Sequence, residues 1–410
     1  MTKQTFSLEE LEQIDLLVSG VIGWRKLPES WSGEQKAGVR LTAVGKMTAN
    51  DKLQNSIRGG ETILLAEKHN CEQMIGELRV PLAIAGPMRL YSEKVEKIIQ
   101  VPLATTEGAL VASVQRGMKA TFSAGIQTQV IEVGTSRAPV LVVEGMEQGK
   151  TIIEWLLKNI SLLETIALET SSHLKLLGIE PELVGRNLYV RLRFETGEAM
   201  GMNMVTIATD RMMAFVTKQF GIRCAAVSGN ACVDKKPAWR NFLSGRGLKV
   251  QAEVRLSRAT VRDILKATPE QIVEVVTRKS WLGSMVSGAM GFNAHFANMV
   301  AALYLATGQD IAHVVEGSMG ITTAEVVEDN LYFNVWLPSV MVGVVGGGTQ
   351  LPTQRASLSI LGLSSATEGD KKKLAAIVAG TVLCGELSLS AALATQDLAG
   401  AHQQLSRGRA

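Results

Sequence analysis

Charged side chains are scarce in this sequence. Asp, Glu, Lys and Arg make up 20% of its 410 residues, against about 25% in an average soluble domain. The longest stretch without any of them runs from Ser280 to Gln309 and exceeds the roughly 20 apolar residues that a membrane-spanning helix needs. The stretch nevertheless contains Asn293, His295 and Asn298, which are costly in a bilayer. We therefore interpret it as a buried segment of a large core, with no membrane partner.

Cysteine and histidine are also scarce, and neither occurs in a metal-binding pattern. The sequence has four cysteines and five histidines, without a CxxC pair or an HExxH motif. We therefore expect no metal site, and we interpret the cysteines as reduced thiols of a cytoplasmic protein. The beginning of the chain lacks the basic and then apolar run of a signal peptide, which agrees with a cytoplasmic location.

Two further classes of protein are disfavoured by what is missing. The 42 basic and 39 acidic residues nearly balance, whereas a nucleic-acid surface needs a clustered excess of basic residues. No nucleic-acid partner is therefore expected. Neither the GxGxxG fingerprint of a Rossmann domain nor a GxxxxGK[ST] P-loop occurs. What the chain has instead is 39 glycines, several of them clustered with polar residues at expected helix starts.

The length of 410 residues indicates two or three domains. Residues 1–70 are polar and mixed, with short helical patterns such as Leu8–Val18. Strand and helix patterns then alternate between residues 139 and 227: strands at 140–145, 187–194 and 223–228, and helices at 150–177 and 202–220. The second helix is expected to end at Gly221. This alternation predicts a compact α/β domain inserted into a larger one.

The segment ATTEGALVAS (104–113) places Glu107 directly after Thr105 and Thr106, either of which can cap a helix. In one interpretation Glu107 is a carboxylate in the first turn, stabilised by the helix dipole. In the other it donates or accepts a proton in a reaction. The residues alone leave both interpretations open.

Two glycine-containing segments are candidates for contact with a ligand. In ETGEAMGMNMVTIATD (195–210), two glycines precede a helix that begins near Met202, and backbone N–H groups at such a start bind phosphates. In VGGGTQLPTQ (345–354), three glycines allow the backbone to approach a ligand closely. The alternatives are a tight strand-to-helix turn and contact with another strand.

Lysines and an aspartate form a second group of candidates. Lys235 and Lys236 follow an aspartate in SGNACVDKKPA; such lysines usually lie in solvent, but a desolvated one stabilises a developing oxyanion. Asp310 follows a helix that Asn293 is expected to cap. The C-terminal dipole of that helix is expected to raise the pKa of Asp310, unless Asp310 is a loop residue paired with a cation.

Two histidines have open interpretations. His295 is interpreted as a core or interface residue rather than as a catalyst. His402, near the end of the chain, titrates near neutrality and is either incidental or an acid on a mobile flap.

Seven segments between Asn70 and His402 together resemble the 3-hydroxy-3-methylglutaryl-CoA (HMG-CoA) reductase family, in its order and spacing. They are VPLAIAGP, ATTEGALVAS, EAMGMNM, SGNACVDKKPA, GFNAHFANMVAALYLATGQD, GGGTQLPTQ and GELSLSAALA. The EAMGMNM form is similar to the first class of that family, in its soluble prokaryotic form. The resemblance implies reductive deacylation of HMG-CoA to mevalonate and CoA with two hydrides from NAD(P)H, in the mevalonate route to isoprenoids.

The resemblance also implies an α+β fold, with a large mixed domain around a long central helix, which residues 293–308 would supply. Four regions are then expected: a helical N-terminal region (1–70), the large substrate-binding domain (71–138 and 228–395), an inserted ferredoxin-like NAD(P)-binding domain (139–227) and a C-terminal flap (396–410). Active sites in this family form between subunits, so a homodimer or homotetramer is expected.

Four catalytic residues follow from the resemblance. Lys235 would stabilise the thiohemiacetal oxyanion, and Glu107 would hand a proton to that oxygen. Asp310 would lie between them and tune both pKa values. His402 would protonate the departing CoA thiolate, because the pKa of a free thiol is about 8.5.

The resemblance assigns binding roles to two further groups. Contacts with HMG-CoA are expected from Arg137, Ser228, Asp234, Lys236, Lys279, Asn298, Ser113 and Arg116. Contacts with the dinucleotide are expected from Glu198, Met200, Gly201, Met202, Asn203, Gly346 and Gly347.

Two departures from the family pattern bear on the cofactor. Glu198 stands where the family usually has an aspartate, and Ser172 stands where first-class members often have an arginine that pairs with the 2′-phosphate of NADPH. Serine cannot replace a bidentate guanidinium, although Lys175 is close enough in sequence to compensate. NADPH is the first expectation and NADH the alternative.

Other functions remain open at this point. A reductase of the same fold acting on another acyl-CoA is disfavoured by Arg137, Lys236 and Lys279, since three cations suit a free carboxylate. Oxidative degradation of mevalonate with NAD is chemically possible with the same residues. A non-catalytic CoA- or nucleotide-binding protein is disfavoured because all four catalytic residue types are present.

Overall fold

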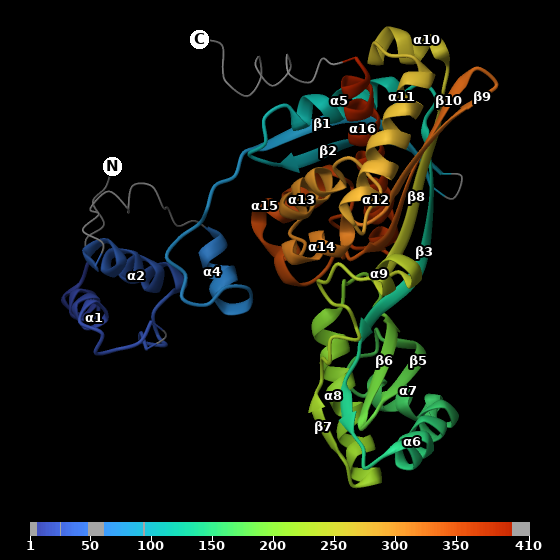
Figure 1. Ribbon diagram of the computed structural model, residues 1–410. Helices are drawn as coiled ribbons and strands as arrows, with labels where there is room; N and C mark the ends of the chain where they lie inside the picture. The colour runs from blue at the N-terminus through green and yellow to red at the C-terminus, as the bar shows by residue number, and fades with distance from the viewer. Residues whose placement is uncertain (1–5, 25, 48–60, 93–94, 396–410) are drawn as a thin grey trace.

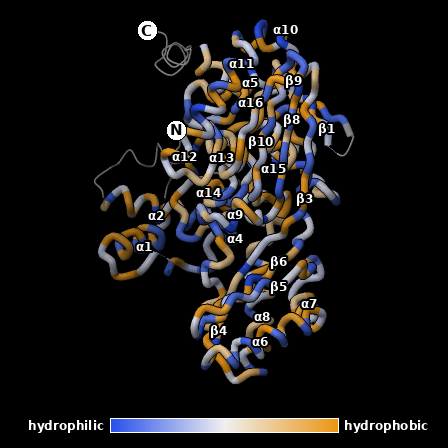
Figure 2. Tube along the Cα trace, turned by 45° about the vertical axis from the view of Figure 1, so that its right-hand side comes forward, coloured by the Kyte–Doolittle hydropathy of each residue, from blue (hydrophilic) through white to orange (hydrophobic). Residues whose placement is uncertain are grey.

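The computed structural model describes residues 6–24, 26–47, 61–92 and 95–395, which form three parts (Figure 1). Helices near the N-terminus lie beside a larger part that contains a sheet and most of the helices. A smaller part, formed by residues in the middle of the chain, extends from one end of the larger part. Figure 2 shows hydrophobic residues along the elements of the larger and the smaller part. The buried ones form a separate cluster in each of these two parts.

The N-terminal helices are α1 (Leu8–Val18), α2 (Gly33–Met47) and α4 (Glu61–His69). At the start of α1 the Ser7 hydroxyl accepts the Glu10 N–H, and the Glu10 carboxylate accepts the Ser7 N–H at 2.7 Å. This reciprocal pair satisfies backbone donors that a helix start leaves free. The helix predicted for Leu8–Val18 is confirmed, and its buried Ile14 and Leu17 pack in a small core of their own with Val39.

The larger part is built on a largely antiparallel sheet. Its strands are β1 (Leu82–Ser92), β2 (Val95–Ala104), β3 (Ile126–Arg137), β8 (Gly247–Leu256), β9 (Ile321–Val327) and β10 (Asn330–Val340). Only β1 and β3 pair in parallel among the described strands. The longer helices are α5 (Leu110–Thr121), α11 (Pro269–Val275), α13 (Phe296–Thr307), α15 (Pro352–Ile360) and α16 (Asp370–Ala394).

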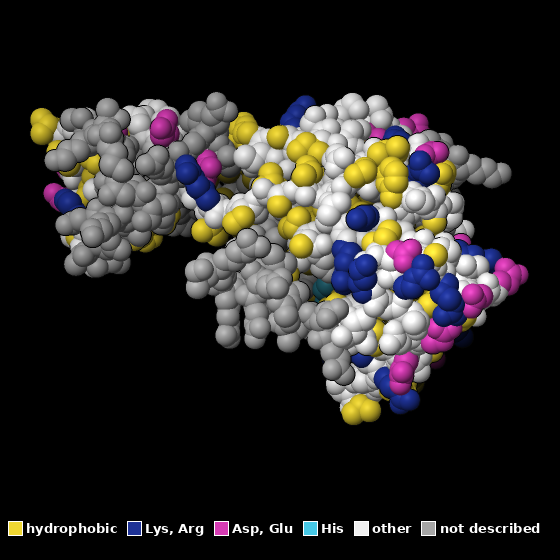
Figure 3. All heavy atoms as spheres, turned by 90° about the horizontal axis from the view of Figure 1, so that it is seen from above, with side chains coloured by type: hydrophobic (Ala, Val, Ile, Leu, Met, Phe, Trp, Pro, Cys, Tyr) yellow, Lys and Arg dark blue, Asp and Glu magenta, His cyan; other side chains and the backbone are white. Residues whose placement is uncertain are grey.

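Short helical turns connect these elements. They are α9 (Trp239–Ser244), α10 (Arg258–Thr260), α12 (Ser284–Ser287), α14 (Val314–Gly317), the 3₁₀ turns η3 (Ile311–His313) and η4 (Gly347–Gln350), and the π-helical turns η1 (Val261–Leu265) and η2 (Val276–Gly283). On the face shown in Figure 3, basic and acidic side chains lie interspersed, in keeping with the net charge of +3.

Helix α16 occupies the centre of the larger part. It contacts α5, α11, α13 and the strands β3, β8 and β10. Every residue from Leu374 to Ser388 is buried, as expected of a helix that is apolar on all sides. Gly117 of α5 lies so close to the backbone of Cys384 that any Cβ there would collide with it. This close packing fixes α5 against the central helix.

The central position was predicted for residues 293–308, and that prediction is wrong. The corresponding helix, α13, has 12 residues and packs beside α16, which has 25. Among the described helices, α16 is the one long and apolar enough to cross a membrane, and 94% of its apolar window is buried in the fold. The central position of α16 was not evident from the sequence, because three lysines at its start and the buried Glu386 interrupt its apolar run.

The smaller part is a four-stranded antiparallel sheet with helices. Its elements in chain order are β4 (Val140–Val142), α6 (Met146–Lys158), α7 (Ile160–Leu168), β5 (Lys175–Val184), β6 (Asn187–Glu195), α8 (Met202–Phe220) and β7 (Arg223–Ala226). The strands lie in the order β7-β4-β6-β5. Helix α8 ends at Gly221, which has φ +64° and donates to Thr217, so the predicted end is confirmed.

One helical segment expected in the smaller part is interrupted. Residues 150–177 form two helices that meet at Asn159, and β5 then begins at Lys175. The strand escaped notice because Gly178 and Pro181 weaken its alternation of apolar and polar residues.

Strand β3 belongs to both sheets. Residues 127–134 pair with β8, and residues 135–137 pair with β6. At the transition, Gly134 has φ +95°, and a Cβ there would lie 2.8 Å from Leu177 Cδ1 and 3.0 Å from the Phe194 carbonyl. Glycine is required because an L side chain tolerates neither that backbone conformation nor that crowding. The two parts of the fold are therefore joined by continuous strand.

Candidate active site

A cavity of about 1110 Å³ lies where the smaller part meets the larger one. Its walls come from the loop before α8, from the turn after α13, from the glycine segment before α15, and from the Asp234–Lys235 pair. Each of these segments was singled out in the sequence, although they are far apart along the chain. The fold thus brings most of the predicted site residues to one place.

All the predicted cofactor contacts line this cavity. They are Glu198, Met200, Gly201, Met202, Asn203, Gly346 and Gly347. The two loops that carry them are hydrogen-bonded to each other, since the Val344 N–H donates to the Glu198 carbonyl and Ala199 pairs with Val345. Thr135 of β3 adds a bond of 2.8 Å from its hydroxyl to the Met200 carbonyl.

The glycines of these loops leave room beside the backbone. Gly201 caps the N-terminus of α8 with φ +89°, and a Cβ there would collide with the Thr196 side chain. Gly346 and Gly347 also have positive φ, and a Cβ on either would meet no atom within 4 Å. Free N–H groups at the start of α8 and exposed glycine backbone therefore face one cavity, an arrangement suited to the phosphates of a dinucleotide.

Glu198 has an additional structural role. Its carboxylate accepts the Gly369 N–H at 2.7 Å and the Lys371 N–H at 2.6 Å. These are backbone donors at the start of α16, which any helix leaves unsatisfied. The Glu198 side chain therefore ties the cofactor loop to the central helix.

Arg137, at the end of β3, forms the centre of a polar group on the cavity wall. Its guanidinium donates to Ser228 Oγ at 3.1 Å and lies 3.4 Å from Asp234 Oδ2. It also donates twice to Thr206 Oγ1, at 2.7 and 3.1 Å. Lys236 Nζ lies 3.3 Å from the Asp234 carbonyl. Four residues predicted to contact substrate are thus adjacent, and Thr206 is a fifth member that the sequence reasoning missed.

Lys235 and Asp310 form an ion pair at the cavity, with 2.8 Å between Nζ and Oδ2. Both side chains remain more than a third exposed, so they are accessible to a ligand. Asp310 caps η3 by accepting the Ala312 N–H at 3.1 Å. Burial raises the pKa of Asp310, but the hydrogen bond from Lys235, the charge of His313 and the Ala312 N–H together lower it below its ordinary value.

The predicted rise in the pKa of Asp310 is therefore wrong. Helix α13 ends at Gly308, which has φ +71°, so the dipole of α13 acts on a residue that has already turned away from its end. Asp310 begins the next helical turn instead, where N–H groups and cations favour the carboxylate. The expected capping role of Asn293 is partly correct: its Oδ1 accepts the Phe296 N–H at 3.1 Å, although the N-cap position is His295.

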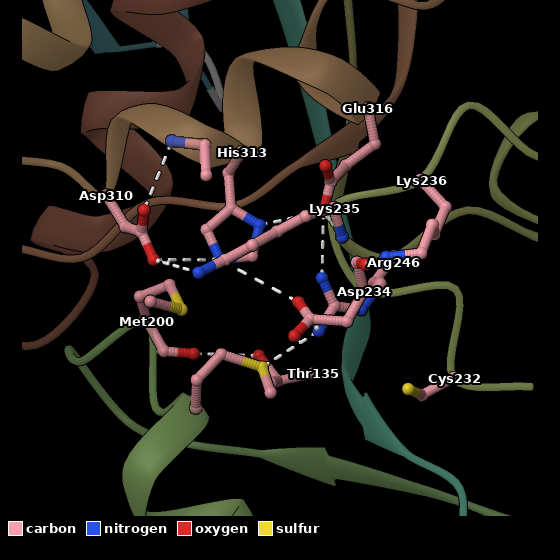
Figure 4. Close-up of polar contacts among 12 residues, drawn as sticks. Thr135, Met200, Cys232, Asp234, Lys235, Lys236, Arg246, Asp310, His313 and Glu316 are labelled. Atoms are coloured by element: carbon pink, nitrogen blue, oxygen red, sulfur yellow. Dashed lines mark hydrogen bonds and ion pairs between the residues drawn. The ribbon is translucent and has the colours of Figure 1, made fainter. Parts of the chain in front are cut away.

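Three fully buried residues lie beneath the ion pair, and the sequence reasoning missed all of them. Arg246 Nη1 lies 2.9 Å from Glu316 Oε1, and Arg246 Nη2 lies 3.0 Å from Asp234 Oδ1. His313 Nδ1 lies 2.7 Å from the same Glu316 oxygen. Figure 4 shows His313 between Asp310 and Glu316, with the Lys235 side chain passing in front. Charged side chains are seldom buried without a reason, and a buried cluster beside a cavity is a candidate for a functional role.

Asp234, His313 and Glu316 have ligand atoms within 4.8 Å of one another, close enough to hold a metal ion. The Arg246 guanidinium, however, lies within hydrogen-bond distance of both carboxylates. It already supplies the positive charge that a metal would contribute, and a divalent cation beside it would be repelled. We therefore assign the three residues to an ion-pair network.

Glu107 lies apart from the cavity. It sits in the loop before α5, and its Oε1 accepts from Asn298 Nδ2 at 3.3 Å. The predicted cap is wrong, because α5 begins at Leu110 with Ala109 as its N-cap. Asn298 is seven residues before Leu305, which lines the cavity; at 1.5 Å per residue, the two lie about 10 Å apart along α13.

The other predicted substrate contacts also lie elsewhere. The Ser113 hydroxyl and the Arg116 guanidinium both bond Ser388 Oγ of α16, each at 3.0 Å. Lys279 is exposed on η2 and lines a separate cavity of about 420 Å³ near the end of α16. His402 lies outside the described residues.

Comparison with known proteins identifies the chain. The sequence model of the hydroxymethylglutaryl-coenzyme A reductase family matches residues 36–407. The chain is 49% identical to the 3-hydroxy-3-methylglutaryl-coenzyme A reductase of Methanocaldococcus jannaschii over 84% of this chain and 86% of that protein. It is 45% identical to the enzyme of that name from Pyrococcus abyssi over 91% of this chain and 90% of that one.

Solved structures are similar in fold. The reductase of Streptococcus pneumoniae matches with a TM-score of 0.64 and 18% sequence identity, over 95% of this chain and 97% of that one. A class II reductase of the same organism, bound to NADPH in open conformations, matches with a TM-score of 0.63 at 18% identity and the same coverage. The extent of the sequence matches settles the assignment: this chain belongs to the hydroxymethylglutaryl-coenzyme A reductase family.

Proposed function

We propose that the chain converts HMG-CoA to mevalonate and CoA with two equivalents of NAD(P)H, through the residues of the cavity between the two parts of the fold. Membership of the family makes it an oxidoreductase that uses a nicotinamide cofactor. The observation that carries the proposal is the Lys235–Asp310 ion pair, which lines the same cavity as the glycine loops at 196–203 and 346–348.

The cofactor is proposed to lie along these loops. Backbone N–H groups at the start of α8 would bind the pyrophosphate of the cofactor. The open space beside Gly346 and Gly347 would let the cofactor approach the backbone of these two residues. When bound, the nicotinamide supplies the hydride that reduces the thioester and then the aldehyde. Residues 139–227 would form a ferredoxin-like cofactor domain. Their elements follow in the order β-α-α-β-β-α-β, which matches the ferredoxin-like β-α-β-β-α-β order when α6 and α7 count as one helical connection.

Lys235 is proposed to stabilise the oxygen that becomes negative as the thioester carbonyl is reduced. Its ammonium group is held by Asp310 and exposed to the cavity, where an oriented cation acts without reorganisation. Glu107 would hand a proton to that oxygen, and His402 would protonate the CoA thiolate. Asp310 would hold Lys235 in place and tune the pKa values of Lys235 and Glu107.

The free carboxylate of HMG is proposed to bind at Arg137, Ser228, Asp234 and Lys236. Support comes from their contacts with one another, beside a cavity that Arg137 and Asp234 line. Thr206 and Ser228 fix the orientation of the guanidinium, and a substrate carboxylate would compete with Asp234 for its Nη1 group. Lys279 and Asn298 would complete this subsite, and Ser113 and Arg116 would contact CoA.

A second copy of the chain is proposed to complete the site. Glu107, Asn298, Lys279, Ser113 and Arg116 do not line the Lys235 cavity of the same chain, so a complete set would require two chains, in a homodimer or homotetramer. Mixing Glu107→Gln protein with Lys235→Ala protein, each inactive alone, should then restore activity. A mixture that stays inactive after subunit exchange would contradict a shared site.

For the cofactor we propose NADPH, with NADH as the alternative. Ser172 is exposed and carries no charge, whereas His173 lines the cavity beside Gly197. Lys175 lies nearby at the start of β5, exposed to solvent. We also propose the class I-like, soluble prokaryotic form, located in the cytoplasm, on the basis of the EAMGMNM segment.

The remaining domain limits are proposals as well. Residues 71–138 and 228–395 would bind substrate, residues 1–70 would form a helical N-terminal region, and residues 396–410 would be a flap carrying His402. The packing of α16 against strands from both segments of the larger part supports their treatment as one domain.

The direct test is to follow oxidation of NADPH and of NADH in the presence of HMG-CoA, together with release of the CoA thiol. We expect two cofactor molecules oxidised for each thiol released. An acyl-CoA without a second carboxylate tests the first alternative, since equal turnover would favour a reductase of different specificity. Reduction of NAD by mevalonate and CoA, run in parallel, measures the capacity for the degradative direction.

A further inference from the structure

Lys235 is held from two sides in this fold. Its ammonium group pairs with Asp310 at 2.8 Å, and its backbone N–H donates to Glu316 Oε1 at 3.2 Å. Its φ of +55° is left-handed, a conformation that a residue with a Cβ keeps only when its surroundings hold it there. The position of the ammonium group therefore depends on residues that the reacting atoms never touch.

Glu316 is the fixed point of this arrangement. One of its oxygens, Oε1, lies within hydrogen-bond distance of Lys235 N, of Arg246 Nη1 at 2.9 Å and of His313 Nδ1 at 2.7 Å. The side chains of Glu316, Arg246 and His313 are wholly buried. A buried carboxylate keeps its place only while such donors compensate its charge. Glu316 thus anchors the backbone of Lys235 to the core.

His313 connects this anchor to the other end of Lys235. With Nδ1 directed at Glu316, its Nε2 faces Asp310 Oδ2 at 3.7 Å and Asp234 Oδ1 at 3.9 Å. Nε2 is buried and makes no hydrogen bond among the described residues. Both ring nitrogens therefore face carboxylate oxygens.

Two cations and a tyrosine also lie near His313. Lys235 pairs with Asp310 and Arg246 pairs with Asp234, so each cation is already compensated by an acid. Tyr304 of α13 lies beside Glu316, and burial followed by the Glu316 charge raises the pKa of its hydroxyl. The Tyr304 hydroxyl therefore stays neutral. The acids that His313 faces are Glu316 at Nδ1 and the Asp310–Asp234 pair at Nε2.

We propose that His313 and Glu316 are positioning residues for Lys235: Glu316 fixes its backbone, and His313 fixes the Asp310 carboxylate that holds its ammonium group. The inference rests on the proposed role of Lys235 and deepens it. Because the cofactor loops are built from other residues, loss of either positioning residue changes the reduction steps and leaves cofactor binding intact.

The first experiment compares His313→Gln with the parent enzyme. Glutamine can still donate to Glu316, but it has no second nitrogen to face Asp310. We expect kcat with HMG-CoA to fall about tenfold, as for loss of roughly 1.4 kcal/mol of transition-state stabilisation, while KM for NAD(P)H changes less than about twofold. Mevaldehyde reduction should fall by the same factor, because Lys235 serves both steps. His69→Gln, at an exposed position on α4, is the matched control.

The second experiment is a double-mutant cycle, which separates positioning from a merely structural role. In a Lys235→Ala background, His313→Gln should cost less than about twofold, because residues that act through one another are not additive. Equal losses in both backgrounds would overturn the inference and leave the proposed function intact. Full activity of Lys235→Ala itself would remove both the proposed role of Lys235 and the inference.

Glu316→Gln provides an independent variant. It keeps the size of the side chain and an oxygen for the Lys235 N–H, but it leaves Arg246 less compensated. We expect a loss of kcat of about tenfold that is again absent in the Lys235→Ala background. If this variant fails to fold, His313→Gln decides alone. Activity that is lost on chelation and restored by a divalent cation would assign the cluster to a metal and overturn the inference.

Discussion

The Nζ atom of Lys235 lies 2.8 Å from Oδ2 of Asp310, although 75 positions separate them (310 − 235). Lys235 follows the last strand of the smaller part, and Asp310 follows the buried helix α13 of the larger part. Their pairing therefore forms only when the loop after β7 packs against the turn after α13. An incompletely assembled fold would have neither the cation nor its counter-ion in place.

Replacement of this lysine should be the most damaging single change. Lys235→Ala removes the proposed oxyanion stabiliser, so kcat with HMG-CoA should fall about 10²-fold or more. Steady-state oxidation of the cofactor measures the effect. Lys150→Ala, exposed on α6, should keep the parent rate. A Lys235→Ala enzyme with parent kcat would refute the role.

Asp310 should contribute stability that depends on pH in one direction. Its pKa in the folded state lies below the ordinary 3.8, so the folded chain releases the proton more readily than the unfolded one. The contribution is fully present above the ordinary pKa and is lost as the pH falls through the folded value. The stability difference between parent and Asp310→Asn, measured by urea unfolding, should stay constant from about pH 7 to 5 and shrink below about pH 4. A difference that grew on acidification would contradict this sign.

Thr206 should matter for substrate binding, although sequence reasoning gave it no role. Thr206→Val removes the oxygen that accepts two hydrogen bonds from Arg137. Hydrogen bonds to charged groups contribute about 1.5–3 kcal/mol, so KM for HMG-CoA should rise at least about tenfold, with a smaller change in KM for the cofactor. Thr217→Val, whose hydroxyl bonds only within α8, is the control. Equal rises for both substrates would point to general damage to α8.

Glu198→Asp should weaken the start of the central helix. A side chain one methylene shorter cannot span both the Gly369 and Lys371 N–H groups. Loss of a cap costs about 1 kcal/mol, which thermal or urea unfolding can measure, and KM for NAD(P)H should rise because the loop is released. Glu154→Asp, exposed on α6, should lose little. Unchanged stability would show that the cap is dispensable.

Cofactor preference should respond to residue 172. Ser172→Arg introduces a guanidinium next to His173, which lines the cavity. A bidentate pair with the 2′-phosphate should raise the ratio of kcat/KM for NADPH over NADH by about tenfold or more. Ser171 is already bonded within its own turn, so Ser171→Arg serves as a positional control. An equal response at both positions would indicate a general electrostatic effect.

Sequence reasoning located the parts of the site that carry short motifs. The glycine loops around Gly201 and Gly346, the DKK segment and Asp310 were each visible because unusual residues occur close together in the chain. Arg246, His313 and Glu316 were not visible. Arg246 and Glu316 are 70 residues apart, and charged residues read singly look like solvent-exposed positions. Their burial depends on tertiary packing.

The sequence also did not show which helix occupies the centre of the core. The uncharged stretch from Ser280 to Gln309 looked more central than α16, because the absence of charge is easily seen in sequence. Glu386, inside α16, is compensated by the N–H groups of Ala294 and His295 and by the Thr322 hydroxyl. Such compensation allows a charged residue in the most buried helix, and no local pattern reports it.

The continuity of β3 ties the geometry of the cavity to one crowded junction. Arg137, at the end of this strand, lines the cavity, whereas residues 127–134 pair with β8 of the larger part. Gly134→Ala would place a Cβ against Leu177 and the Phe194 carbonyl. The strand would then have to shift at the junction, so a change that touches no ligand would displace Arg137 from its place in the cavity.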